Sequence, residues 1–213
     1  IGVTPEAWAS NFSATQNGTA FANGGTDDAS FGFMSANAYR SSTGWKYINS
    51  NLASLYAQSG SSHQWSTAAS GTADAAITWS EAMRIDSSGN LLVGKTSGPN
   101  YNVVGVDITR LGEGQFTVNS NPVLQLNRKT SDGDIAVFRK DGSTVGNIMA
   151  RSGDMAIGTG NTGLRFSDAD RTIYPFDSTV PNEPSNVISF GDSGSTFKDL
   201  YLSGGVYLGG TGS

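Results

Sequence analysis

The central part of the chain is a series of short apolar segments, each closed by a glycine-containing turn. The apolar pairs are Leu124/Leu126, Ile135/Val137, Val145/Ile148, Met155/Ile157 and Leu164/Phe166. The turn sequences between them are Ser131-Asp132-Gly133, Lys140-Asp141-Gly142, Arg151-Ser152-Gly153 and Thr159-Gly160-Asn161. Alternating apolar residues punctuated by Asp-Gly or Ser-Gly predict β-hairpins. No segment is long enough to bury a core alone, so we expect neighbouring copies of the chain to complete it.

The composition fits a repetitive β-structure and argues against several other classes of protein. Glycine accounts for 28 of the 213 residues, and only 15% of residues are charged, whereas about 25% is typical of soluble domains. The net charge is −5 and aromatic residues make up 10% of the chain, so disorder driven by charge repulsion is not expected. The mild acidity argues against nucleic-acid binding, which requires clustered lysine and arginine.

The absence of cysteine and of long apolar runs excludes further classes of protein. Without cysteine the chain has no disulfide framework and no thiolate metal or redox site. No apolar run reaches the roughly 18 residues of a spanning helix, so membrane insertion is not expected. The sequence starts at Ile1 and stops at Gly-Thr-Gly-Ser, and we expect both ends to be boundaries within a longer polypeptide.

Changes in residue composition and pattern along the sequence divide the chain into four regions. Residues 1–17 are expected to be a linker or a short helix, because Thr4-Pro5-Glu6 has the residue types of a helix N-terminus. Residues 18–94 are rich in aromatic residues and are predicted to form an antiparallel, sandwich-like β domain. Residues 95–122 are predicted to be a linker with further strands, and residues 123–213 a trimeric β-fibre segment.

A degenerate glycine–strand–glycine unit occurs three times in the chain. Gly89 to Gly94 and Gly153 to Gly158 have the same spacing and enclose alternating apolar residues, and Gly204 to Gly209 is a weaker copy. These three segments indicate a weak, irregularly spaced repeat. Residues 170–185 are rich in proline, which excludes a central strand there.

Aromatic residues of the second region are the candidate glycan-binding residues. They lie on predicted strands among polar neighbours, where an aromatic ring can stack on a sugar ring. The four candidates are Trp45, Tyr47, Tyr56 and Trp65. Core packing is the favoured alternative for any one of them, because aromatic side chains supply much of the burial in a small domain.

No catalytic motif is recognisable in the sequence. His63 is the single histidine, so a Ser-His-Asp triad would have to include it. The carboxylate pairs closest in sequence are Asp27/Asp28, Asp132/Asp134 and Asp168/Asp170. Such pairs can serve a glycosidase or bind calcium, but all three lie in turns, where aspartate is favoured for its backbone hydrogen bonds. We therefore expect no enzyme activity, no catalytic residue, no bound metal and no cofactor.

Three stretches resemble the tail-fibre proteins of tailed bacteriophages. They are residues 83–94, 128–166 and 197–209. Each stretch alone is too degenerate to identify a family, whereas the three stretches in this order are a more specific signal. The resemblance implies a trimeric, β-rich fibre on a virion that binds a receptor on the host surface, with no fixed catalytic motif in this region. Such regions often precede a self-cleaving intramolecular chaperone; none follows here, so we expect a mature product or a cut piece.

The residues and the resemblance together predict an all-β fold in which three identical chains complete one apolar stripe. The expected partners are two further copies of the chain, other tail, baseplate or head proteins, and a host-surface glycan or outer-membrane receptor. The expected location is the virion. Two alternatives remain: a tailspike with glycan depolymerase activity, and a head fibre or capsid-decoration protein.

Overall fold

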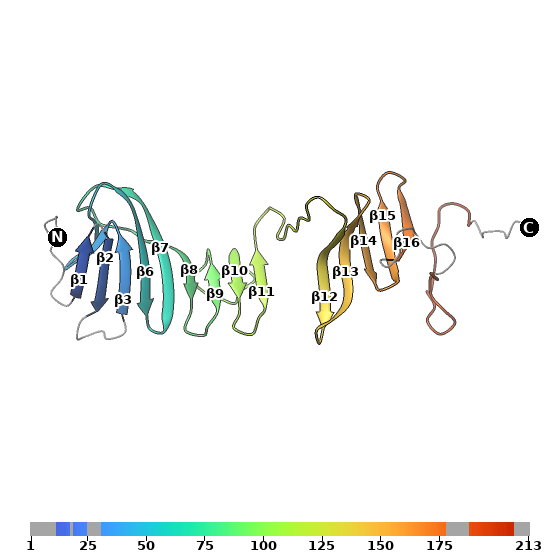
Figure 1. Ribbon diagram of the computed structural model, residues 1–213, viewed down its shortest axis with the longest axis horizontal. Coiled ribbons are helices and arrows are strands. Elements are labelled where there is room, and N and C mark those ends of the chain that lie inside the picture. The colour runs from blue at the N-terminus through green and yellow to red at the C-terminus, as the bar shows by residue number, and fades with distance from the viewer. Residues whose placement is uncertain (1–11, 18, 25–30, 178–187, 207–213) are drawn as a thin grey trace, which may run out of the picture. The chain divides into compact units, whose positions relative to one another are not determined.

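The computed structural model of the protein describes residues 12–17, 19–24, 31–177 and 188–206 (Figure 1). Within these residues all regular structure is β-strand, the strands pair antiparallel and no helix is present. The predicted all-β fold class is confirmed. The chain divides into two compact units after Leu124, and each unit is built on its own sheet.

The first unit contains a nine-stranded antiparallel sheet, here called the first sheet. Its strands, in spatial order, are β1 (Phe12–Asn17), β2 (Thr19–Gly24), β3 (Phe31–Ala36), β6 (Asn51–Ser59), β7 (Ser62–Gly71), β8 (Ser80–Ile85), β9 (Leu91–Val93), β10 (Gly105–Ile108) and β11 (Gly114–Thr117). A separate two-stranded sheet consists of β4 (Ala38–Ser41) and β5 (Gly44–Tyr47).

The β6–β7 hairpin lies within the region predicted to be antiparallel β-structure. Gly60 and Ser61 form its two-residue turn, and both have positive φ, at 54° and 64°. Turns with positive φ at both positions match the right-handed twist of the strands they join. The resulting register pairs Tyr56 with Trp65, which places both rings on the same face of the sheet.

Two turns of the first sheet share one hydrogen-bond pattern. The N–H of Asp86 donates to the carbonyl of Asn90 and the N–H of Thr109 to that of Glu113, both at 2.9 Å. The side-chain oxygen of the first residue accepts from the N–H of the fifth, at 2.9 Å and 3.1 Å. A glycine with positive φ, 83° or 89°, is the fourth residue of each turn. The β8–β9 and β10–β11 hairpins are thus structural repeats.

One face of the first sheet is covered by other parts of the same chain. Near β3 and β6 the cover is the β4–β5 hairpin together with residues 72–79, which pair with β5. Near β9 to β11 it is the loop of residues 94–104. The second layer is therefore one small hairpin and two loops. We call this side the covered face; its buried residues include Phe33, Ala57, Leu92, Asp107 and Gln115.

The second unit contains a five-stranded antiparallel meander, here called the second sheet. Its strands are β12 (Gly133–Lys140), β13 (Ser143–Arg151), β14 (Asp154–Thr159), β15 (Thr162–Ser167) and β16 (Thr172–Phe176). Asp141-Gly142 and Ser152-Gly153 join the first three strands, and all four residues have positive φ. These turns are the ones that the Asp-Gly and Ser-Gly signals predicted.

Several boundaries differ from those predicted. Residues 12–17, expected in a linker or helix, form β1 instead, while Thr4-Pro5-Glu6 lies outside the described residues. Strands β10 and β11 continue the same sheet past residue 94. The prediction of a strand around Leu124 and Leu126 is wrong. These residues follow Pro122 and lie in a segment without strand between β11 and β12.

Two further predictions concern the third glycine–strand–glycine unit and the proline-rich region of residues 170–185. Residues 204–206, the described part of the third glycine unit, contain no strand. Strand β16 includes Pro175, in the region expected to be irregular. It is the edge strand of the second sheet, where a residue without an N–H costs no ladder hydrogen bond.

Candidate interaction surface

The other face of the first sheet is open and carries no charge along its two main rows. The strand register aligns one row across seven strands: Met34, Tyr56, Trp65, Met83, Val93, Val106 and Phe116. The neighbouring row on the same side contains Gln58, His63, Ile85, Leu91 and Ile108. We call this side of the first sheet its open face.

The apolar side chains of the open face are substantially exposed. Met34 is 52% exposed, Phe116 46% and Val93 39%. Six inter-strand spacings of about 4.8 Å make the row about 29 Å long. Soluble monomers rarely expose a contiguous apolar surface of more than a few hundred Å². A continuous, uncharged row of this length therefore marks an interaction surface.

The second sheet repeats this division into faces. On one side the register aligns apolar residues, and no charged residue stands among them: Ile148, Ala150, Met155, Ile157, Leu164, Phe166 and Ile173. Five of these are exposed, Ile173 the most at 62%. This side is the open face of the second sheet. The opposite side holds the buried cluster of Met149, Ala156 and Phe176.

Charged side chains of the second sheet gather on that opposite side. Arg165 contacts the carboxylate of Asp154 through Nε at 3.0 Å and through its terminal nitrogen at 2.9 Å. The hydrogen bond from Arg165 lowers the pKa of the Asp154 carboxyl. The guanidinium groups of Arg151 and Arg165 lie over the rings of Phe176 and Tyr174. On strands β14 to β16, the charged side chains and the exposed apolar side chains thus lie on opposite faces.

Two of the predicted glycan-binding residues lie in the core of the first unit. Trp45 packs edge-on against Phe33 and Trp79, with ring centroids 4.6 and 5.7 Å apart. Tyr47 is buried, and its hydroxyl donates to the carbonyl of Ala69 at 2.5 Å. Trp45 is partly buried against the core, and the Arg40 guanidinium lies over its ring, so the core-packing alternative fits both residues.

The other two predicted residues, Tyr56 and Trp65, meet on the open face. Their ring centroids are 5.1 Å apart, and His63 stacks beside them at 6.1 and 6.5 Å. The Tyr56 hydroxyl lies 2.6 Å from His63 Nδ1. Gln58 donates its side-chain amide to that hydroxyl at 2.9 Å. His63 was not among the predicted glycan-binding residues, although the observed β6–β7 register places it next to Tyr56 and Trp65.

The carboxylates considered for catalysis or calcium bind groups of their own sheet. Asp132 accepts from the N–H of Ser152 at 2.7 Å, and Asp134 from the Asn147 amide at 2.6 Å. Asp170 accepts from the Tyr174 hydroxyl at 2.9 Å, and the N–H of Asp168 donates to Asp154 at 3.3 Å. Asp27 and Asp28 lie outside the described residues. The described part of the chain contains no cluster of three or more histidine or acidic residues suited to a metal ion.

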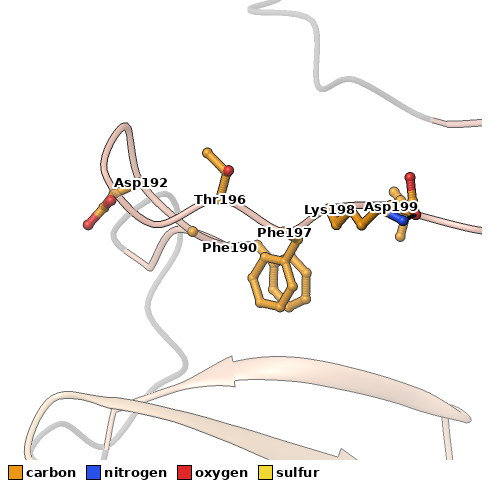
Figure 2. A pocket seen from close by; sticks show the side chains of 8 residues that line it. Phe190, Asp192, Thr196, Phe197, Lys198 and Asp199 are labelled. Carbon is orange, nitrogen blue, oxygen red and sulfur yellow. Dashed lines mark ion pairs between the residues drawn. The ribbon is translucent and has the colours of Figure 1, made fainter.

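A shallow pocket of about 580 Å³ lies in the loop around residues 190–200. Figure 2 shows the rings of Phe190 and Phe197 stacked on each other, with centroids 3.9 Å apart and planes 9° apart. The Asp192 carboxylate accepts from the N–H groups of Gly194 and Ser195 at 2.8 and 2.6 Å. The two rings cover each other's inner faces, while the side chains remain 76% and 61% exposed.

No helix in the described residues has the length and apolar character needed to cross a membrane. Comparison of the chain with protein-family models, with curated proteins and with solved structures finds no match.

Proposed function

We propose that this chain is a structural protein of a bacteriophage virion, a tail fibre that acts as a homotrimer and attaches to a receptor on the host surface. The single observation that supports this proposal most strongly is the uncharged, apolar open face found on both sheets. Its rows contain no group that would repel an identical surface, so copies of the chain can pack these faces together around a common axis.

Burial of the open faces supplies the energy for such an assembly. A Val, Leu, Ile, Phe or Met side chain contributes about 1.5–3 kcal/mol when it passes from full exposure to full burial. Side chains that are half exposed in one protomer therefore gain about 1 kcal/mol each on association. Repeated over the rows of both sheets, this gain favours a permanent assembly over a transient one.

The resemblance to tail-fibre proteins supports the proposal that this assembly is part of a virion. The stretches that resemble tail-fibre proteins include the β8–β9 repeat and strands β12 to β15 of the second sheet. Glycan depolymerase activity is not proposed, because the carboxylates of Asp132, Asp134 and Asp170 each hold a turn or strand of their own sheet. We infer a binding role for the chain at the cell surface.

Measurement of the mass in solution tests the assembly. Light scattering on the wild-type chain should give three times the 22.1 kDa chain mass. Val93→Asp places a charge in the middle of the open face and should lower that mass. Ser87→Asp, in an exposed turn of the same unit, is the matched control and should not. A 22.1 kDa wild-type species would refute the homotrimer.

Staining of intact cells tests the attachment role. Fluorescently labelled wild-type protein should bind some strains in a panel of bacteria and leave others unstained, as a receptor-dependent fibre does. The Val93→Asp variant should stain them more weakly, because it lacks the multivalency of a trimer. Equal staining of all strains, or of none, would count against a receptor-binding fibre.

A further inference from the structure

The loop of residues 94–104 is held on the covered face by a buried ion pair. Lys95 Nζ lies 2.6 Å from Asp107 Oδ2, and the two side chains are 0% and 2% exposed. The same ammonium group donates to the carbonyl of Asn100 at 2.8 Å. The base of the loop is thus joined both to strand β10 and to its own outer part.

Further contacts fix the backbone on both sides of Tyr101. The N–H of Asn100 donates to Asp107 Oδ2 at 3.4 Å, and the N–H of Asn102 to Asn100 Oδ1 at 2.8 Å. The hydroxyl of Thr117 donates to the carbonyl of Tyr101 at 3.3 Å. At Gly98 the loop lies so close to the sheet that a Cβ atom would collide with the Asp107 carboxylate.

This construction exceeds what the connection between two strands requires. Strands β9 and β10 are antiparallel neighbours, and such strands can be joined by two residues. A buried ion pair carries a desolvation penalty that offsets much of its attraction, and such pairs are best explained where they specify one conformation. The loop is therefore longer than the connection requires: besides covering Leu92 and Asp107, it has a fixed shape around Tyr101.

That fixed shape presents one aromatic ring to solvent. Tyr101 is 71% exposed, and the exposed side chains next to it, Asn100 and Asn102, are uncharged hydrogen-bonding amides. A tyrosine ring gives a large contact area at a small cost in conformational entropy. An aromatic face flanked by neutral amides matches the chemistry of a sugar, which has an apolar ring face and a rim of hydroxyl groups.

We infer that the loop of residues 94–104 is a carbohydrate-binding site, in which Tyr101 stacks on a neutral pyranose ring and Asn100 and Asn102 bind its hydroxyl groups. The inference deepens the proposed function and rests on it in one respect. If the open face joins copies of the chain, Tyr56 and Trp65 are enclosed, whereas the loop lies on the opposite side of the sheet and stays accessible.

Saturation-transfer NMR tests the site with the methyl glycosides of glucose, galactose, mannose and N-acetylglucosamine as probes. The wild-type protein should receive a signal from at least one of them. Tyr101→Ala should weaken that binding at least tenfold, Asn102→Ala several-fold, and Tyr101→Phe less than twofold, because phenylalanine retains the ring face. Tyr201→Ala is the matched control: Tyr201 is 89% exposed but far from this loop in the sequence, and its loss should change nothing.

Two results of the NMR experiment would overturn the inference. One is the absence of binding to all four glycosides by the wild-type protein; the other is wild-type affinity in Tyr101→Ala. Tyr101-dependent staining of cells that survives periodate oxidation of their sugars would also overturn it, in favour of a protein partner. The mass of each sample separates this test from that of the fibre: a monomer with Tyr101-dependent sugar binding would remove the homotrimer and keep the site.

Discussion

The two faces of the first sheet differ in how their side chains are protected from water. The covered face buries polar and charged groups such as Asp107 and Gln115 under loops of the same chain. The open face carries apolar and neutral residues, and no described segment of the first unit covers it. Loops can cover polar groups because their backbone donates and accepts hydrogen bonds. A flat apolar face has no such need, and we propose that an identical face covers it.

The largest effect is expected from breaking the cover over Asp107. Asp107→Leu leaves Lys95 buried without its partner, and loss of one member of a buried pair costs about 3–5 kcal/mol. Urea denaturation should report this loss as a lower free energy of unfolding. The double variant Lys95→Met/Asp107→Leu should recover most of it, because no unpaired charge remains.

The exposed pair of Lys140 and Asp141 provides the control for that experiment. Its side chains are 78% and 84% exposed, and such pairs contribute about 0–1 kcal/mol. Lys140→Ala should therefore leave the free energy of unfolding nearly unchanged. Equal losses in Lys140→Ala and Asp107→Leu would contradict the view that burial makes the Lys95–Asp107 pair essential.

The next largest effect is expected from a comparison of two adjacent residues of β9 that lie on opposite faces of the first sheet. Leu92 is fully buried on the covered face, while Val93 beside it is 39% exposed on the open face. Leu92→Ala should lower the stability by about 2–5 kcal/mol at any protein concentration. Val93→Ala should lower it by less than about 1 kcal/mol, and only at concentrations where the chains associate.

Unfolding curves at two protein concentrations measure this difference. A concentration-dependent midpoint for the wild type is expected, because association stabilises only the folded chain. A Val93→Ala loss that is the same at both concentrations would mean that the open face is not an interface between copies.

A smaller effect concerns the turn at Asp86, which borders both faces. Burial raises the pKa of this carboxyl, but hydrogen bonds from the Asn90 backbone and side chain and from the Ser88 backbone outweigh that effect, so the pKa is lowered. Because the folded-state pKa is lowered, the ionised carboxylate stabilises the fold at pH values above the ordinary pKa of about 3.8. This contribution disappears as the pH falls through the lower folded-state pKa.

Asp86→Asn tests this turn. It should lower the stability by about 1–2 kcal/mol at pH 7, since hydrogen bonds to a charged group are lost. The difference from wild type should shrink as the pH falls through the range below 3.8. Thermal melts between pH 7 and pH 3 measure it. Ser87→Ala keeps the carboxylate and should retain the wild-type profile; a constant difference at every pH would exclude the carboxylate as the cause.

Local patterns in the sequence predicted the strands better than the site. The β6–β7 hairpin and the β12–β15 meander follow alternation and turn chemistry, which act between near neighbours. Alternation assigns residues to two faces but does not say which face the chain covers, so it left Tyr47 and Tyr56 equivalent. The structure places Tyr47 in the core and Tyr56 on the open face.

The candidate sugar-binding loop was invisible to local patterns for a physical reason. Its threonine, serine, glycine, proline and asparagine residues predicted a linker, since composition describes the conformational freedom of an isolated segment. The order of this loop comes from the contact of Lys95, at its start, with Asp107 on β10, and these two residues meet only in the folded chain. The Thr109 turn was missed in a similar way, because threonine replaces the aspartate of its repeat partner, Asp86.

The smallest effect is expected at a turn of the second sheet that favours neither face. Gly153 has a φ of 86°, and a Cβ atom there would meet nothing within 4 Å. Gly153→Ala therefore tests backbone conformation alone and should cost about 1 kcal/mol, because an L-residue with a side chain is strained in this region. Gly204→Ala also adds a methyl group in open space but lies outside this φ range, so urea denaturation should show no loss. Equal losses in both variants would indicate that the added methyl group, and not the turn conformation, disturbs the second sheet.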